Sequence, residues 1–341
     1  MSKFSKTQLI SIFSTLGSQL TQPDEQLLAI INDEKQYNAW FTPESVLGAV
    51  KAIGSMLKSD DLMSWLNRYE LPQKEESKRI GLILAGNIPL VGFHDVLSVL
   101  VTGNFALIKS SSQDARLIKY VLQMLVDIEP TLKNNYSIVD RLEKFDAVIA
   151  TGSNNTSRYF EYYFGKVPNI IRKNRSSVAL LTGEETKEQL FKLGYDIFDY
   201  YGLGCRNVSK VLVPKGYIFN FFFESIEEYN LIINHHKYNN NYDYNKSIYL
   251  VNSDKHFDNG FLLLKEDKKL TSPLAVLYYE YYDDLQSAQT LLQQESDNIQ
   301  CIVTSVPLDI KNQVVSFGMS QQPALWDYAD GVDTMAFLTA L

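Results

Sequence analysis

The sequence IGLILAGNIPL, at residues 80–90, is a short apolar run that ends in small and polar residues. Runs of this kind, without alternating polar positions, are typical of strands buried on both faces of a parallel sheet. Two similar runs follow at residues 105–108 and 147–150, and a helical pattern comes after each of the three. This repeated order of strand and helix predicts an α/β domain built around a parallel sheet.

Each of the three runs ends in residues that suit a ligand, because ligands of open α/β sheets bind outside the carboxyl ends of the strands. These residues are Asn87 after the first run, Lys109, Ser110, Ser111 and Ser112 at the end of the second, and Gly152 and Ser153 after the third. The dinucleotide fingerprint GxGxxG is absent. The turn at residues 152–153 is therefore open to two interpretations, a phosphate site before a helix or an ordinary turn with capping residues.

Residues 1–72 carry helical patterns. Thr42, Pro43 and Glu44 form a helix start, with a capping hydroxyl, a proline at the first helical position and an acid in the first turn. We expect these helices to pack as a layer on the nucleotide-binding domain, which we place at residues 73–182.

A second α/β domain is expected at residues 183–318, and residues 319–341 form a C-terminal segment whose role as a lid or a contact stays open. A predicted helix over residues 186–201 opens this domain. Residues 238–245, rich in Asn and Tyr, predict a surface loop. β-like runs occur at residues 247–251, 261–264, 274–278 and 301–304, with a helical pattern at residues 285–293.

The stretch YYGLGCRNVSKVLVP, at residues 200–214, places Cys205 after two glycines and before a β-type run. Glycine lets the backbone turn tightly and pass close to a ligand, so a cysteine there can present its sulfur as a nucleophile. A small buried core residue explains the same pattern, because a thiol without a disulfide partner is commonly buried. The second cysteine, Cys301, lies within an apolar run and is expected in the core.

The composition argues against several classes of protein. A net charge of −8 disfavours a surface that grips nucleic acid, because phosphate binding needs clustered Lys and Arg. The two cysteines form no CxxC pair, and the histidines lack metal-ligand spacing, so we expect neither a disulfide framework nor a metal site. Residues 1–20 lack the apolar stretch of a secretory signal, and no run approaches the ~18 apolar residues of a membrane span. A cytoplasmic protein is expected.

The order of these motifs resembles the aldehyde dehydrogenase superfamily, in particular its branch of acyl-CoA reductases similar to LuxC. The resemblance covers roughly residues 79–335 and rests on Asn87-Ile88-Pro89, Gly103-Asn104, Lys109-Ser110-Ser111, Thr151-Gly152-Ser153 and Cys205. It implies a nicotinamide-binding domain and a thiol domain that meet over a cleft, and an acyl-cysteine intermediate.

The resemblance also implies roles for single residues. Cys205 matches the nucleophile, and Asn87 matches the side-chain amide that stabilises the oxyanion together with the Cys205 N–H. Lys109 matches the basic residue near the adenosine ribose, with the serines at 110–112 beside it. Gly152 and Ser153 match the pyrophosphate site.

Three positions depart from the superfamily pattern. Ser112 stands where a Glu usually holds the ribose hydroxyls, which removes repulsion against a 2′-phosphate and favours NADPH, with NADH as the alternative. Ile171, followed by Arg172, stands where dehydrogenases keep the Glu that activates water. Lys269 stands where a Glu is expected before Pro273, at the nicotinamide ribose contact. The chain is also shorter than most relatives, so a dimerisation segment is expected to be reduced and a homo-oligomer stays open.

The resulting expectation is an NADPH-dependent reductase that converts an acyl-CoA to an aldehyde through an acyl group on Cys205. Two other interpretations stay open. An aldehyde-oxidising NAD(P) dehydrogenase of the same fold would need a carboxylate near Cys205, supplied from elsewhere in the chain. An inactive relative that binds a nucleotide or a partner protein would bury Cys205 without an adjoining cleft.

Overall fold

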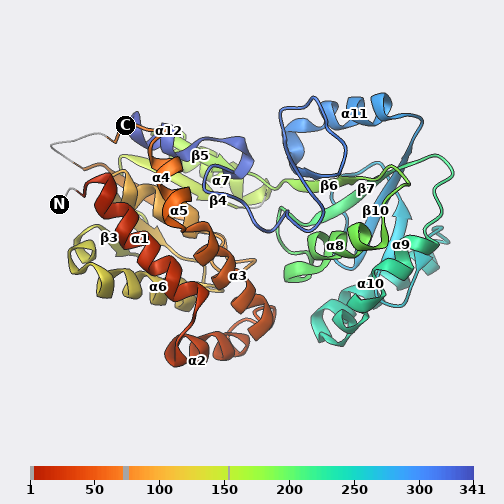
Figure 1. Ribbon diagram of the computed structural model, residues 1–341, viewed down its shortest axis with the longest axis horizontal. Coiled ribbons are helices and arrows are strands. Elements are labelled where there is room, and N and C mark those ends of the chain that lie inside the picture. The colour runs from red at the N-terminus through yellow and green to blue at the C-terminus, as the bar shows by residue number, and fades with distance from the viewer. Residues whose placement is uncertain (1–3, 72–76, 153) are drawn as a thin grey trace. The chain divides into compact units, whose positions relative to one another are not determined.

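The computed structural model of the protein describes residues 4–71, 77–152 and 154–341. The chain forms two compact units (Figure 1). Unit 1 comprises Met1–Asn174 and Pro323–Leu341, and unit 2 comprises Arg175–Gln322.

A five-stranded parallel sheet in the order β3-β2-β1-β4-β5 lies at the centre of unit 1. The three strands predicted from the apolar runs are its three central strands, so that prediction is confirmed. The register pairs Ile83 with both Lys109 and Ala150, and β1, β2 and β4 therefore end at the same edge of the sheet. The strands are β1 (Arg79–Ile83), β2 (Phe105–Lys109), β3 (Tyr136–Ile138), β4 (Ala147–Thr151) and β5 (Asn169–Arg172).

Helices pack on this sheet, and the N-terminal helix α1 packs against one of them. The helix α5 contacts β1 and β2, α7 contacts β4 and β5, and α6 contacts the N-terminal α1. Thr42 caps α3 and Pro43 is its first residue, as predicted. The helices are α1 (Lys6–Thr21), α2 (Glu25–Asp33), η1 (Glu34–Gln36), α3 (Pro43–Met56), α4 (Ser59–Leu66), α5 (Phe93–Val101), α6 (Ala115–Ile128), η2 (Pro130–Asn134) and α7 (Asn154–Phe164).

The C-terminal segment returns to unit 1 and ends in η6 (Ala329–Gly331) and α12 (Thr334–Thr339). In Figure 1 the blue α12 lies among the early helices of this unit, where it contacts α5. The Trp65 indole N–H donates to the Tyr328 hydroxyl at 2.7 Å, and His94 Nε2 lies 2.9 Å from the Leu325 carbonyl oxygen. These contacts show that the segment completes the core of unit 1.

Unit 2 is built on a seven-stranded sheet in the order β12-β11-β6-β7-β10-β9-β8, in which only the β8–β9 pair is antiparallel. Its strands are β6 (Ser176–Leu180), β7 (Val208–Pro214), β8 (Phe257–Asp258), β9 (Leu263–Glu266), β10 (Val276–Tyr282), β11 (Ile299–Val303) and β12 (Gln313–Val315). Its helices are α8 (Lys187–Phe198), η3 (Asp199–Gly202), α9 (Asn220–Ser225), η4 (Glu227–Asn234), α10 (His236–Val251), α11 (Leu285–Gln294) and η5 (Ser296–Asn298).

The helix α10 corrects two expectations, the surface loop at residues 238–245 and the strand at residues 247–251, which are wrong. Its buried residues are Tyr238, Tyr242, Asn245 and Tyr249, a spacing that places all four on one face of a helix. Tyrosine has an apolar ring and a polar tip, so these positions do not stand out as apolar in the sequence. The tertiary contacts of the rings outweigh the weak helix propensity of the asparagines.

The strand β6 decides where the two units divide. It pairs with β7 and β11 of unit 2, so the division falls at 174/175, whereas the sequence analysis places it at 182/183. The chain returns to unit 1 at 322/323, compared with an expected 318/319. A short apolar strand gives no signal of which of two sheets it joins.

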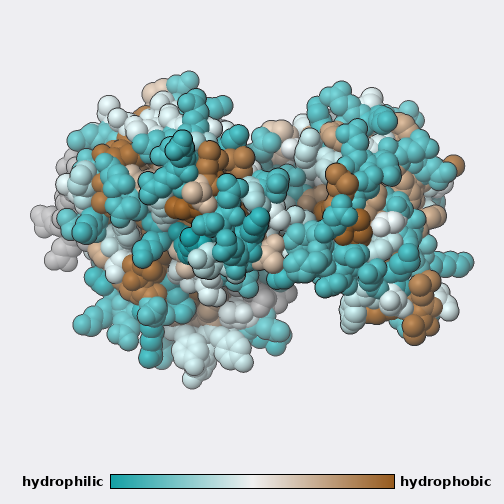
Figure 2. Space-filling view, turned by 90° about the horizontal axis from the view of Figure 1, so that it is seen from below, coloured by the Kyte–Doolittle hydropathy of each residue, from teal (hydrophilic) through white to brown (hydrophobic). Residues whose placement is uncertain are grey.

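No helix within the described residues is long and apolar enough to cross a membrane. The face of the molecule in Figure 2 is mainly hydrophilic, and its hydrophobic residues form separate patches.

Candidate active site

The turn that carries Cys205 lies between η3 and β7 of unit 2, and Cys205 is exposed. Three successive residues before it have left-handed backbone, Tyr200 (φ 52°), Tyr201 (φ 60°) and Gly202 (φ 78°). Glycine adopts this conformation readily, whereas each tyrosine costs about 1–3 kcal/mol. Surrounding contacts must offset this cost, and such strain is common where a backbone presents a functional group.

Asn207 fastens this turn to the end of α8. Its side-chain amide donates to the carbonyl oxygens of Asp196 (3.2 Å) and Asp199 (2.9 Å), and its Oδ1 accepts the N–H of Gly204 at 2.8 Å. The Asn207 side chain is buried, so these bonds are shielded from water. The sequence analysis missed this residue, because an asparagine before a strand has no distinctive pattern.

Buried residues of the neighbouring strands support the turn that carries Cys205. The Ser177 hydroxyl donates to the Cys205 carbonyl oxygen at 3.0 Å and lies 3.1 Å from Cys301 Sγ. Burial raises the pKa of the Cys301 thiol, although Arg206 and Ser177 act in the opposite direction. Cys301 is therefore a protonated core thiol, which confirms the expectation, and Cys205 is the exposed sulfur of the pair.

Two carboxyl groups, those of Asp196 and Asp199, lie at the end of α8, close in sequence to the turn that carries Cys205. Asp196 accepts the N–H groups of Gly318 (2.6 Å) and Ser320 (2.9 Å) and so ties a second loop to this helix. Burial, and secondly the neighbouring Asp196, raises the pKa of Asp199 to about 7. A carboxyl group with this pKa can exchange a proton at neutral pH. Asp199 is a further residue that the sequence analysis did not single out.

In unit 1, the polar residues predicted from the strand ends lie at one edge of the sheet. Asn87 is exposed in the loop after β1. Lys109 is exposed at the end of β2, where its ammonium donates to the Asp140 carbonyl oxygen at 2.8 Å. Of the three serines that follow, Ser110 and Ser111 are half-buried and Ser112 is exposed.

Gly152 follows β4 just before the N-terminus of α7, while Ser153 lies outside the described residues. A Cβ at position 152 would lie 2.8 Å from Cε2 of Phe160, so a larger residue there would require the Phe160 ring to shift. The amino end of a helix, an exposed lysine and hydroxyl groups suit the phosphates and ribose of a nucleotide. The described residues therefore fit a nicotinamide nucleotide.

Ile171, which the resemblance places at the position of the superfamily's water-activating Glu, lies in β5. Its neighbour Arg172 is buried and forms a bidentate ion pair with Asp95 of α5. The Arg172 guanidinium also donates to the Thr334 hydroxyl of α12 at 3.0 Å. Arginine accepts no proton at neutral pH, so this segment ties the C-terminal helix to the sheet and offers no base.

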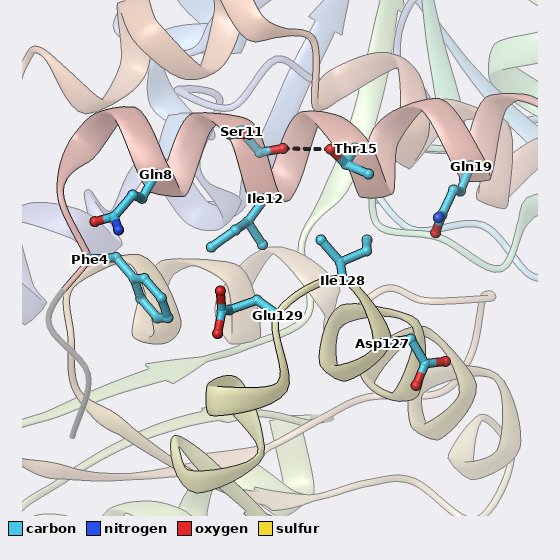
Figure 3. A pocket seen from close by; sticks show the side chains of 9 residues that line it. All are labelled: Phe4, Gln8, Ser11, Ile12, Thr15, Gln19, Asp127, Ile128 and Glu129. Atoms are coloured by element: carbon cyan, nitrogen blue, oxygen red, sulfur yellow. Dashed lines mark hydrogen bonds between the residues drawn. The ribbon is translucent and has the colours of Figure 1, made fainter.

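A groove of about 590 Å³ lies between α1 and the end of α6 in unit 1 (Figure 3). Figure 3 shows the side chains of Phe4, Ile12 and Ile128 toward its centre, with Asp127 and Glu129 beside them. None of the predicted site residues lines it, and we assign it no role. Among the described residues, no group of three or more His, Cys, Asp or Glu side chains could hold a metal ion.

Solved structures similar to this chain show its fold. Aldehyde dehydrogenase 21 from Physcomitrella patens matches with a TM-score of 0.71 at 11% identity, covering 99% of this chain and 84% of that one. Lactaldehyde dehydrogenase from Escherichia coli matches with a TM-score of 0.66 at 14% identity, over 92% and 79%. The Mycobacterium tuberculosis aldehyde dehydrogenase complexed with NAD+ matches with a TM-score of 0.65 at 12% identity, over 92% and 77%.

Sequence comparison identifies the family. No curated protein matches the chain by sequence. The family described as acyl-CoA reductase (LuxC) matches residues 15–188, slightly more than half of the chain. The matched segment contains Asn87 and the strand-end residues of unit 1 and ends before Cys205. The protein therefore belongs to the LuxC acyl-CoA reductase family and is an oxidoreductase built on the aldehyde dehydrogenase fold.

Proposed function

We propose that the protein reduces an acyl-CoA thioester to an aldehyde through an acyl group carried on Cys205. The observation that supports this proposal most strongly is the exposed Cys205 thiol, held by Asn207 and Ser177 in a turn at the amino end of β7. The family of the chain supports an acyl-CoA as the substrate class, and its fold supports a nicotinamide cofactor.

In the first half-reaction, the Cys205 thiol gives its proton to solvent and the thiolate attacks the acyl carbonyl carbon. The bond from this carbon to the CoA sulfur breaks, and CoA leaves as a thiolate that takes up a proton. Asn87 and the Cys205 N–H are the proposed donors to the oxygen that carries the negative charge between these two events. The acyl group is then bound to Cys205 as a thioester.

In the second half-reaction, the acyl carbon is reduced and its bond to Cys205 breaks, which releases the aldehyde and restores the thiolate. When bound, a nicotinamide cofactor supplies the hydride for this step. Lys109, Ser110, Ser111 and Ser112, with Gly152 and Ser153, are the residues proposed to hold that cofactor. We propose NADPH as the preferred form, because serine at position 112 leaves room for the charge of a 2′-phosphate.

Replacing Ser112 with glutamate is expected to weaken NADPH binding at least tenfold more than NADH binding. Two like charges a few ångströms apart repel by about 1 kcal/mol in water and more strongly near a protein surface, and 1.4 kcal/mol is a tenfold change in affinity. Fluorescence titration of both cofactors measures the effect. Ser112→Ala is the matched control and should leave the preference unchanged. Equal weakening of both cofactors by Ser112→Glu would contradict the placement.

Oxidation of an aldehyde by the same fold is the second candidate function, and the raised pKa of Asp199 is the observation that favours it. That reaction requires water to attack the acyl-cysteine while a base takes its proton. The position of the superfamily's base holds Ile171, beside the ion-paired Arg172. We propose Asp199, which has a pKa of about 7 and lies close in sequence to Cys205, as the carboxyl group that would replace it in such a dehydrogenase.

The lifetime of the acyl-enzyme decides between these two functions. We expect a panel of acyl-CoAs to leave an acyl mass on Cys205 that persists for minutes without a reductant and disappears within a catalytic turnover when NADPH is added. Quenched mass spectra over time measure both phases. Rapid loss to the carboxylic acid without NADPH, slowed by Asp199→Asn, would instead establish the dehydrogenase. Absence of acyl mass with every acyl-CoA would reject the reductase.

A further inference from the structure

The loop at residues 86–90, here called the Asn87 loop, is held at both of its ends by the segment that follows β2. At one end, Gly86 faces Ser111 so closely that a Cβ on Gly86 would lie 2.4 Å from Ser111 Oγ. At the other end, the Leu90 N–H donates to Asp114 Oδ2 at 2.9 Å. Asn87 is the exposed residue between these two fixed points.

Asp114 has an unusual place for a residue at the start of a helix. It precedes α6, where an aspartate ordinarily accepts an N–H of its own helix, but its side chain makes no capping bond there. It reaches instead across the sheet edge to Leu90, and its other oxygen, Oδ1, is buried without a hydrogen-bond partner. Burying a carboxyl group in this way costs free energy, which the bond to the Leu90 N–H offsets in part.

The backbone of Leu90 shows what the bond accomplishes. Leu90 has a φ of 56°, a left-handed conformation that a bulky residue adopts only when its surroundings enforce it. Its side chain is buried, and the Asp114 carboxyl group binds its N–H. Without that bond, relaxation of Leu90 would turn the chain at Ile88 and Pro89 and move Asn87.

We propose that Asp114 is a positioning residue, which fixes the Asn87 side chain in the place where it stabilises the oxyanion. This inference rests on the proposed function, because it assigns a cause to the role of Asn87 in acyl transfer to Cys205. Positioning matters at this scale, since a displacement of about 1 Å can cost a hundredfold in rate.

The charge of Asp114 guides the choice of variants. Burial raises its pKa to about 8, opposed by the Leu90 N–H and assisted by the nearby Glu34. Glu34 itself lies 3.4 Å from the Arg116 guanidinium. Because neutral acid predominates at pH 7, Asp114→Asn retains both the shape and an oxygen that accepts the Leu90 N–H, while Asp114→Ala removes the acceptor.

The test is a double-mutant cycle on single-turnover acylation of Cys205, measured by mass spectrometry without cofactor. We expect Asp114→Ala to slow acylation about 10–100-fold and Asp114→Asn to stay within about threefold of the wild type. In an Asn87→Ala background, Asp114→Ala should have less than a threefold further effect, because Asn87 is the residue through which it acts. Additive losses would overturn the proposal.

The other end of the loop gives an independent variant in case Asp114→Ala does not fold. Gly86→Ala places a methyl group against Ser111, which forces the loop to shift. We expect Gly86→Ala to slow acylation in the wild type but not in the Asn87→Ala background. A Gly86→Ala defect that persists without Asn87 would overturn the proposal.

Two controls separate positioning from general loss of structure. Asp24→Ala removes another carboxyl group of unit 1 that accepts a single backbone N–H, that of Leu27 at 2.8 Å, and should leave acylation unchanged. The rate at which iodoacetamide alkylates Cys205 should be the same in every folded variant. If Asp114→Ala slows alkylation as much as acylation, the effect is structural and the proposal is wrong. If Cys205 of the wild type takes up no acyl group, both the proposed function and this inference are wrong. If the wild type is acylated but the effects of Asp114→Ala and Asn87→Ala are additive, only this inference is wrong.

Discussion

Cys205→Ala is expected to abolish both acyl-enzyme formation and aldehyde production. The acyl group has no other attachment point in the proposed reaction, because the second cysteine is buried and burial raises the pKa of its thiol. Thiolates rather than thiols attack acyl groups, so Cys301 cannot substitute. Intact-protein mass spectra after mixing with acyl-CoA, and the absorbance of NADPH during turnover, measure the two losses.

The matched control for this experiment is Cys301→Ala. Cys301 lies in β11 within the core of unit 2. Its sulfur contacts the hydroxyl of Ser177, the residue that also binds the Cys205 carbonyl oxygen. We expect this variant to acylate and turn over at close to the wild-type rate, with at most a lower melting temperature. Near-normal turnover by Cys205→Ala would reject the acyl-cysteine mechanism.

Much of unit 1 is predictable from the sequence, because its central strands are continuous apolar runs. Strands buried on both faces need such runs, and parallel strands must end at one edge, so the polar residues after them fall together. The sequence alone therefore predicts that the strands before Asn87, Lys109 and Gly152 lie in parallel in one sheet, and the register of β1, β2 and β4 confirms this for the strands.

Unit 2 shows where sequence patterns stop being informative. The helix α10 buries three tyrosines and an asparagine, which the pattern of polar and apolar residues assigns partly to a loop and partly to a strand. The strand β6 has the right pattern, but its partners are set by the whole sheet and not by its own residues. Such choices depend on tertiary contacts, which outweigh local propensity.

The supporting residues of the site were beyond sequence reasoning for a different reason. Asn207 acts through carbonyl oxygens of α8 and η3, and Asp114 acts through the N–H of Leu90, a residue distant in sequence. A side chain that binds the backbone can have any residue type as its partner. Such a contact therefore cannot be predicted from the residue types in the sequence. The two tyrosines with left-handed backbone before Cys205 likewise give no sign of their conformation in the sequence.

Asn87→Ala is expected to slow acyl transfer by about 10²–10³, the usual effect of removing one oxyanion-hole donor. Negative charge develops on the acyl oxygen both when Cys205 attacks and when the acyl carbon is reduced, so both half-reactions should slow. The fold should persist, because Asn87 is exposed and the loop around it is held by Gly86 and Leu90. Single-turnover acylation and the decay of a preformed acyl-enzyme with NADPH measure the two steps separately.

Alkylation of Cys205 by iodoacetamide distinguishes loss of the donor from damage to the thiol. That reaction develops no oxyanion, so its rate should be the same in Asn87→Ala and in the wild type. Asn67→Ala, at another exposed asparagine of unit 1, should change neither rate. A loss of acylation smaller than about tenfold would remove Asn87 from the catalytic site and leave the Cys205 N–H as the proposed donor. A loss of the expected size in both steps, with unchanged alkylation, would identify Asn87 as a group that acts on the charged oxygen of the substrate.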